Sequence, residues 1–193
     1  MTCGVVVMEL KKFIRDVPDF PEPGILYRDI TPLLGNPEAF GYVIDSLMER
    51  FKSVPIDSIV AIEARGFLFG APLAHKMGKP MVPVRKPGKL PAATYATDYA
   101  LEYGNNSVEL HVDAFEEGAR VLILDDLLAT GGTLAASARL VEMAGGVVCG
   151  IAVVIELNDL NGRRELENYD VFSLVQYKAI AGTGGIGQAA ASP

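Results

Sequence analysis

One short segment near the middle of the chain gathers side chains that can hold a phosphorylated sugar. The apolar run Val121–Leu124 is followed by Asp125 and Asp126, and then by a turn made of Ala129, Thr130, Gly131, Gly132 and Thr133. Glycines let a backbone approach a ligand closely, and the hydroxyls and free N–H groups at a helix start can bind a phosphate. Two carboxylates would repel that phosphate, so they suit neighbouring sugar hydroxyls or a hydrated Mg²⁺. The segment therefore indicates a ribose 5-phosphate site, with an ordinary helix N-cap after an acidic turn as the alternative.

Basic residues cluster in an otherwise acidic chain. The 193 residues carry a net charge of -7, which argues against a protein that coats nucleic acid through bulk charge. From Lys76 to Thr97, however, there is no acidic residue, and the basic residues of this stretch are Lys76, Lys79, Arg85, Lys86 and Lys89. Such an island can concentrate a small anion, and a solvated basic loop is the competing interpretation.

The elements that must position these residues alternate along the chain. Apolar runs predict strands over residues 58–62, 81–84, 121–124, 147–155 and 171–175. Between them, helices are predicted over residues 67–77, 133–143 and 160–166. This alternation favours an α/β fold with a mainly parallel twisted sheet flanked by helices. Because ligands of such sheets bind beyond the carboxyl ends of the strands, the acidic pair and the glycine-rich turn lie where a site is expected.

Two further stretches carry weaker signals. Apolar residues recur at helical spacing from Leu10 to Val17, and Asn36–Pro37 is typical of the start of another helix. Residues 85–106 lack clear periodicity, although Tyr95, Tyr99 and Tyr103 can share one face of a strand or a helix. An unpatterned stretch of this length in a compact domain is more often functional than idle.

The acidic pair and the turn that follows it resemble the signature of the type I phosphoribosyltransferases. Further blocks resemble the adenine phosphoribosyltransferases in particular: residues 20–30 (FPEPGILYRDI), Glu63–Gly70, Val84–Pro91, Leu101–Gly104 and Glu156–Leu157. These blocks keep the family's order and cover most of the chain. The resemblance implies that family's fold, with a small N-terminal hood and a flexible lid loop. It implies a single domain over residues 1–180, and residues 181–193 are expected to be a mobile tail.

The resemblance also assigns the donor site. The reaction it implies moves the phosphoribosyl group of 5-phosphoribosyl 1-pyrophosphate to N9 of adenine, which gives AMP and pyrophosphate. The 5-phosphate falls to Ala129–Thr133 and the ribose hydroxyls to Asp125 and Asp126. The pyrophosphate falls to Glu63, Ala64, Arg65, Gly66, Arg85, Lys86 and Lys89. In this family the Glu63–Gly66 loop often contains a cis peptide bond without proline. Mg²⁺ is expected as the cofactor, carried by the donor with no direct protein ligand assigned.

The lid and the base pocket complete the expected site. Residues 90–107 match the lid, with Gly88 and Gly104 as candidate hinges, and Glu102 matches a lid carboxylate that manages the proton lost by adenine. By its residue type alone, Glu102 would be an exposed hairpin residue. The adenine pocket falls to Leu26, Arg28 and Leu157, for which core packing of the two leucines is the alternative.

The partners and location follow from the same reasoning. We expect adenine, the donor, AMP and pyrophosphate as ligands, a homodimer, and no nucleic acid or membrane partner. The run Val147–Ile155 is too short to span a bilayer, and no signal segment is found, so a cytoplasmic protein is expected. A dinucleotide pattern at Gly182–Gly187 lacks a following helix and is rejected. Two other functions stay open: a nucleotide-sensing regulator on the same fold, and the same transfer to another base such as xanthine or orotate.

Overall fold

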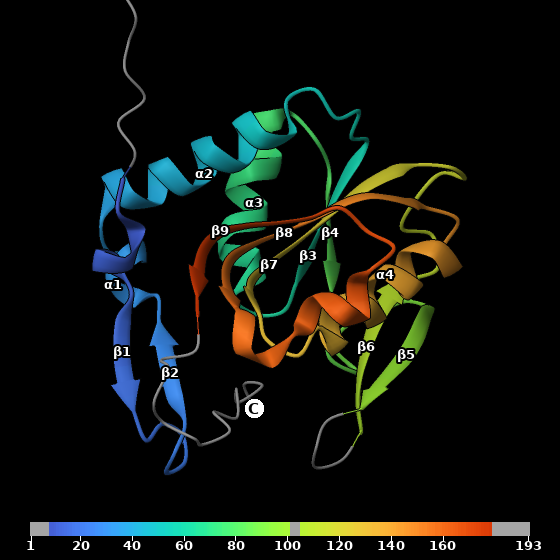
Figure 1. Ribbon diagram of the computed structural model, residues 1–193. Coiled ribbons are helices and arrows are strands. Elements are labelled where there is room, and N and C mark those ends of the chain that lie inside the picture. Colours follow the sequence, from blue (N-terminus) through green and yellow to red (C-terminus); the bar gives the residue numbers. More distant parts are fainter. Residues whose placement is uncertain (1–7, 101–104, 179–193) are drawn as a thin grey trace, which may run out of the picture. The chain divides into compact units, whose positions relative to one another are not determined.

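The computed structural model describes residues 8–100 and 105–178 and divides them into two compact units (Figure 1). The first unit comprises residues 8–45, and the second comprises residues 46–178. The expected tail over 181–193 lies outside the described residues, so the expected division of the chain stays a prediction. Within the described ranges, no helix combines the length and the apolar character that crossing a membrane requires.

The first unit is built around a short antiparallel strand pair. Its elements are η1 (Leu10–Phe13), β1 (Arg15–Pro18), β2 (Leu26–Asp29) and α1 (Thr31–Leu34), and it also contains the start of α2 (Pro37–Phe51). The helix predicted from Leu10 to Val17 is wrong beyond Phe13, because Val17 lies in β1 opposite Tyr27. A residue before proline is disfavoured in the helical region, and a β-branched side chain suits a strand.

Helix α2 begins where the sequence predicts. Pro37 occupies its first position, and the Asn36 Oδ1 accepts a hydrogen bond from the Ala39 N–H at 2.9 Å. The side chain thus satisfies a donor that the first helical turn leaves free. The helix ends at Phe51, within the second unit.

Five parallel strands form the central sheet of the second unit. In chain order they are β3 (Ser58–Ile62), β4 (Met81–Val84), β7 (Arg120–Leu128), β8 (Val147–Leu157) and β9 (Val171–Tyr177). Across the sheet their order is β4-β3-β7-β8-β9. The chain therefore winds from β3 towards one edge and later from β7 towards the other. Open α/β sheets bind ligands at the carboxyl ends of the strands beside such a reversal, here between β3 and β7.

The strand predictions are confirmed in position, and three of them, for β7, β8 and β9, are too short. β3 and β4 have the predicted bounds. β7 was expected to end at Leu124, but it keeps pairing with β8 as far as Leu128. Asp125 and Asp126 therefore belong to the strand itself, and their backbone is held by the sheet.

Helices cover both faces of this sheet. α3 (Gly66–Met77) packs closely on one face, since a Cβ added at Gly70 would lie 2.4 Å from the Ala61 Cβ. On the other face, Val60 joins buried side chains of α4 (Gly132–Met143) in one apolar cluster. Because successive strand residues point to opposite faces, neighbouring residues of β3 serve the two helices in turn.

The stretch without clear periodicity contains an antiparallel hairpin. β5 (Thr94–Ala100) pairs with β6 (Asn105–His111), and the hairpin lies beside α4 in Figure 1. Tyr95 and Tyr99 share one face of β5 and pack against the apolar cluster that contains the α4 side chains, whereas Tyr103, expected on the same face, lies outside the described residues. The expected lid therefore includes strands that are fixed to the helix.

Two further observations concern the expected lid: a hydrogen bond that holds β5, and the backbone at the expected hinges. The Arg139 guanidinium on α4 donates a hydrogen bond to the Asp98 carbonyl of β5 at 3.2 Å. Gly88, one expected hinge, has a φ of +74°, a conformation that favours glycine. Gly104, the other expected hinge, lies outside the described residues.

Two short 3-10 helices connect β8 to β9. They are η2 (Asn158–Leu160) and η3 (Gly162–Leu166), in place of the single helix predicted over 160–166. Asn161 separates them with a φ of +52°. An asparagine tolerates this left-handed conformation and ends the first helix there.

Candidate active site

A loop after β3 and the end of strand β7 meet at the reversal between these two strands. Glu63–Gly66 follows β3, and the acidic pair lies in the last part of β7. A Cβ added at Gly66 would lie 3.0 Å from the Asp125 Oδ1 and 3.0 Å from the Leu124 carbonyl oxygen. Glycine at this position therefore allows the first turn of α3 to lie directly against the acidic pair.

An ion pair joins the loop after β3 to strand β7. The Arg65 Nε lies 2.9 Å from the Asp126 Oδ2, and the Asp126 residue is only 4% exposed. Burial raises the pKa of Asp126, and the positive charge of Arg65 opposes this effect. A buried carboxylate of this kind needs a charged or hydrogen-bonded partner, and Arg65 supplies it.

Asp125 lies beside this pair with one oxygen engaged. Its Oδ1 accepts a hydrogen bond from the Asp126 N–H at 2.8 Å. Burial raises the pKa of Asp125 well above its usual value, and the negative charge of Asp126 raises it further. Two adjacent carboxylates with raised pKa values can accept hydrogen bonds from hydroxyl groups, and they can also hold a shared proton.

The glycine-rich turn continues from β7 into α4. Gly131 has a φ of +90°, and Gly132 begins the helix. Thr130, just before the helix, is exposed and Thr133, in its first turn, is half-buried; no side chain caps the start of α4. This arrangement of hydroxyls, N–H groups and the positive end of a helix is typical of a phosphate site.

A second contact fixes the basic loop that follows β4. The Glu63 carboxylate accepts hydrogen bonds from the Arg85 guanidinium at 2.8 and 3.3 Å, and from the Lys86 N–H at 3.0 Å. The Arg85 guanidinium also donates to the Lys89 carbonyl at 3.0 Å. Hydrogen bonds from Arg85 lower the pKa of Glu63, so the pair is charged at neutral pH. Two residues assigned to one anion, Glu63 and Arg85, thus bind each other.

The loop after β3 has the backbone that the family resemblance implies. The peptide bond between Glu63 and Ala64 is cis. Gly66 follows as the first residue of α3, one position earlier than the predicted start of that helix.

The remaining expected residues belong to different units or lie outside the described residues. Leu26 and Arg28 belong to the first unit, where Leu26 is exposed and Arg28 forms an ion pair with Asp16. Leu157 belongs to the second unit and is half-buried at the end of β8. Glu102 lies outside the described residues. The adenine pocket and the lid carboxylate therefore stay predictions.

The acidic pair offers oxygen ligands of the kind that Mg²⁺ prefers. Within residues 8–100 and 105–178, however, no three His, Cys, Asp or Glu side chains are grouped so as to hold a metal ion. Mg²⁺ as the cofactor therefore stays a prediction.

The sequence did not indicate the residues that pack behind the glycine-rich turn. A Cβ added at Gly131 would lie 2.3 Å from the Gly162 carbonyl oxygen, and one added at Gly162 would lie 2.2 Å from the Ala129 carbonyl oxygen. Gly162 is followed by Arg163, which binds the buried Glu156. The one signal in the sequence is Glu156, an acidic residue near the end of an apolar strand. The sequence does not show that Arg163 is the partner of this carboxylate.

Comparison with known proteins agrees with this geometry. Residues 36–185 match the family described as the phosphoribosyl transferase domain, which is the class of protein that the fold and the site define. An adenine phosphoribosyltransferase from Chloroflexus aurantiacus is 59% identical over 169 residues, which cover 88% of this chain and 98% of that protein.

Solved structures of adenine phosphoribosyltransferases are similar to this chain. The adenine phosphoribosyltransferase from Thermoanaerobacter pseudethanolicus superposes with a TM-score of 0.86 at 54% identity, covering 88% of this chain and 98% of that one. The Saccharomyces cerevisiae enzyme, complexed with an imino-altritol bisphosphate and adenine, gives a TM-score of 0.81 at 44% identity, covering 86% and 96%. The chain belongs to the phosphoribosyltransferase family, in its adenine phosphoribosyltransferase branch. The expected α/β fold with a parallel sheet is confirmed.

Proposed function

We propose that this chain transfers the phosphoribosyl group of 5-phosphoribosyl 1-pyrophosphate to N9 of adenine, forming AMP and pyrophosphate. The observation that carries the proposal is the ion pair between Arg65 and Asp126. Arg65 lies in the segment assigned to pyrophosphate, and Asp126 lies in the segment assigned to ribose. Because these two parts of the donor are joined at C1 of the sugar, their binding segments must meet where C1 lies.

The residues around that point have complementary tasks in the reaction. The C1–oxygen bond to pyrophosphate breaks with its electron pair leaving on the oxygen, and the N9 lone pair of adenine forms the new bond to C1. Asp125 and Asp126 accept hydrogen bonds from the ribose hydroxyls, and their negative charge stabilises the positive charge that develops on the sugar. Arg65 stabilises the negative charge that the leaving pyrophosphate gains.

The glycine-rich turn and the lid serve positioning and proton transfer. Thr130, Thr133 and the first N–H groups of α4 hold the 5-phosphate, so that C1 is placed beside Arg65. Glu102 accepts the proton that adenine loses when N9 forms its bond, a role that rests on the family resemblance alone. The resemblance assigns the flat faces of adenine to Leu26 and Leu157 and the closure of its pocket to Arg28, and these assignments are part of the proposal.

Magnesium and the assembly are further parts of the proposal. Mg²⁺ bound together with the donor would neutralise part of the pyrophosphate charge. The chain acts as a homodimer in the cytoplasm, as the resemblance implies. The carboxylates of Asp125 and Asp126 support the proposal of Mg²⁺, because this ion prefers oxygen ligands.

A panel of bases tests the proposed activity. Purified protein is incubated with the donor, Mg²⁺ and either adenine, hypoxanthine, guanine, xanthine or orotate, and pyrophosphate release is followed. We expect adenine to be used with a kcat/KM at least about a hundredfold above that of any other base, since a site shaped for one base edge leaves polar groups unpaired with another. Preference for another base would contradict adenine as the acceptor. Donor binding without turnover of any base would instead favour a nucleotide-sensing regulator.

The contact between Glu63 and Arg85 leads to a prediction about pyrophosphate. Glu63→Gln removes the charge that holds Arg85 and the Lys86 N–H, so the basic loop loses its anchor. We expect the KM for pyrophosphate in the reverse reaction to rise about fivefold to tenfold. This is the change in affinity expected when one charge-assisted hydrogen-bonding contact is lost. Because the pKa of Glu63 is lowered in the folded protein, the wild-type contact is present at neutral pH and is lost as the pH falls through that lowered pKa.

Glu109→Gln is the matched control for this variant. The Glu109 Oε2 accepts a hydrogen bond from the Gly88 N–H of the same loop at 3.2 Å, and this bond has a neutral donor. We expect its KM for pyrophosphate to change less than twofold, since an amide oxygen can accept the same bond. Equal effects of the two variants would contradict a specific role for Glu63.

A further inference from the structure

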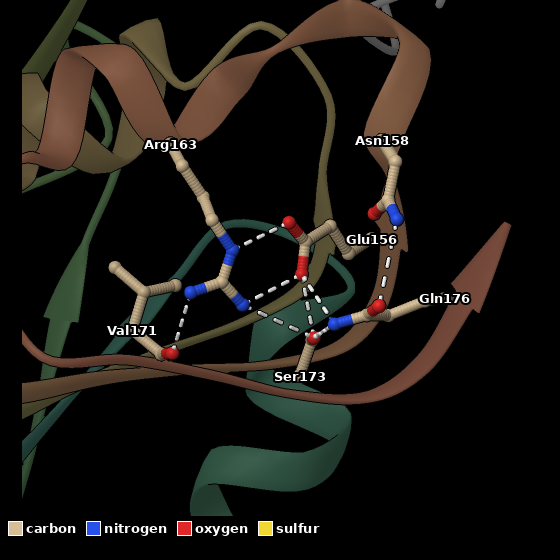
Figure 2. Close-up of polar contacts among 6 residues, drawn as sticks. All are labelled: Glu156, Asn158, Arg163, Val171, Ser173 and Gln176. Carbon is tan, nitrogen blue, oxygen red and sulfur yellow. Dashed lines mark hydrogen bonds and ion pairs between the residues drawn. The ribbon is translucent and has the colours of Figure 1, made fainter. Parts of the chain in front are cut away.

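A buried carboxylate at the end of β8 is fully engaged by neighbouring side chains (Figure 2). Glu156 is 4% exposed, and its Oε1 accepts a hydrogen bond from the Arg163 Nε at 2.6 Å. Its Oε2 accepts hydrogen bonds from another Arg163 nitrogen at 2.8 Å, from the Ser173 hydroxyl at 2.6 Å and from the Gln176 amide at 3.3 Å. These donors, Arg163 first, lower the pKa of Glu156. Glu156 is therefore an ionised anchor and has no free oxygen for proton transfer.

Arg163 connects this anchor to the last strand of the sheet. Besides the two bonds to Glu156, its guanidinium donates a hydrogen bond to the Val171 carbonyl at 2.9 Å and another to the Ser173 hydroxyl at 3.4 Å. Figure 2 shows the Arg163 guanidinium between Glu156, near the end of β8, and Val171, at the start of β9. Four bonds in a planar fork hold the position of Arg163 against two strands at once.

The residue before Arg163 touches the turn assigned to the 5-phosphate. Gly162 has no room for a Cβ, which would lie 2.2 Å from the Ala129 carbonyl oxygen and 3.0 Å from the Gly131 nitrogen. In return, a Cβ at Gly131 would lie 2.3 Å from the Gly162 carbonyl oxygen. The two backbones are therefore in direct contact, so a displacement of residue 162 has to displace the turn or open a gap behind it.

We propose that Glu156 and Arg163 are positioning residues for the 5-phosphate, although neither belongs to the turn that binds it. Their ion pair fixes Gly162, and Gly162 fixes the backbone of residues 129–131 from behind. The inference rests on the proposed function, because it assumes that this turn binds the 5-phosphate of the donor and of AMP.

Direct binding of two ligands separates this role from general stability. AMP carries the 5-phosphate, whereas pyrophosphate is assigned to the Glu63–Gly66 loop. Calorimetric titration of Glu156→Gln and Arg163→Lys with each ligand, in the presence of Mg²⁺, gives both dissociation constants. We expect the Kd for AMP to rise about tenfold, as the loss of one charge-assisted contact implies, and the Kd for pyrophosphate to stay within twofold. A merely structural role would raise both Kd values together.

Three further proteins complete the experiment. Glu142→Gln is the matched control. The Glu142 carboxylate accepts a hydrogen bond at 2.8 Å from the hydroxyl of Tyr169, a residue that follows η3 in the chain. We expect an unchanged Kd for AMP in this variant. Gly162→Ala tests the contact without altering any charge, and it should weaken AMP binding at least as much as Glu156→Gln. The double variant Glu156→Gln, Arg163→Lys should bind AMP no more weakly than the weaker single variant, because the pair acts as one unit.

The outcomes decide between the inference and the proposed function. An unchanged Kd for AMP in Arg163→Lys and Gly162→Ala would overturn the positioning role, and so would equal losses for AMP and pyrophosphate. If Glu156→Gln does not fold, Arg163→Lys, which keeps the charge, and Gly162→Ala still give this answer. A wild-type protein that binds neither AMP nor pyrophosphate would overturn the proposed function, and the positioning role with it.

Discussion

The Gly131→Ala variant should fold and yet lose at least about a hundredfold of its kcat/KM for the phosphoribosyl donor, because small misplacements of a binding group cost this much. A Cβ at residue 131 would lie 2.3 Å from the Gly162 carbonyl oxygen, and ordinary van der Waals contact begins near 3.4 Å. The turn has to move away from Gly162 to make room. Its N–H groups and the hydroxyls of Thr130 and Thr133 would then no longer point to one phosphate. Steady-state kinetics with varied donor concentration measures the loss.

Gly118→Ala is the control for backbone strain in this comparison. Gly118 also has a positive φ, of +76°, but a Cβ there would meet nothing within 4 Å. An alanine in the left-handed region costs about 1 to 2 kcal/mol at either position. Backbone strain alone should therefore lower the stability of both variants by a similar amount in urea unfolding, and the clash with the Gly162 backbone should lower that of Gly131→Ala further. Only Gly131→Ala should lose activity. Full activity in Gly131→Ala would show that this turn does not bind the donor phosphate.

Arg65→Leu should lose both activity and stability. The variant removes the cation assigned to pyrophosphate, and we expect kcat/KM for the donor to fall by at least about a hundredfold. It also leaves Asp126 buried without its ion-pair partner, since the Asp126 residue is 4% exposed. Removing one partner of a buried pair costs about 3 kcal/mol of the free energy of unfolding at neutral pH.

The loss of stability in Arg65→Leu should depend on pH with a defined sign. Burial already raises the pKa of Asp126, and losing the Arg65 charge raises it further. The cost of the buried charge is fully present above that raised pKa and disappears below the pKa of the unfolded chain, where Asp126 is protonated in both states. Urea unfolding should therefore show a large difference from wild type at pH 7 that shrinks as the pH is lowered.

Arg120→Leu is the matched control for Arg65→Leu. Arg120 forms an ion pair with Asp57 at 2.7 Å, but both side chains are about 40% exposed or more. Exposed pairs contribute about 1 kcal/mol or less, so a small loss of stability and no loss of donor kcat/KM are expected. Equal losses in the two variants would argue that the burial of Asp126 has no energetic consequence.

The central strands could be predicted from the sequence because burial on both faces leaves a plain apolar signal. Ser58–Ile62, which is buried throughout, has the predicted bounds for this reason. The edge strand Met81–Val84 is largely half-buried, and its bounds were predicted because all four of its residues are apolar. The prediction for β7 ended too early, since pairing with β8 continues through two carboxylates that no apolar pattern includes. The hairpin of β5 and β6 was missed because its polar residues face outward, and its structure depends on packing against α4.

The site was predictable within one segment and less so between segments. Asp125, Asp126 and the turn that follows are adjacent in sequence, so their residue types alone indicated a phosphate beside hydroxyl groups. The pairing of Glu63 with Arg85, in contrast, depends on the register of two neighbouring strands. The contact of Gly162 with Gly131 depends on how the connection after β8 folds back, and no local pattern encodes this.

A connection such as the one between β8 and β9 is ordinarily a surface loop, in which sequences vary among homologues and insertions are tolerated. Its backbone contact with residues 129–131 changes that expectation for this protein. Chimeras between relatives should tolerate an exchange of residues 158–166 only when residues 128–132 come from the same parent.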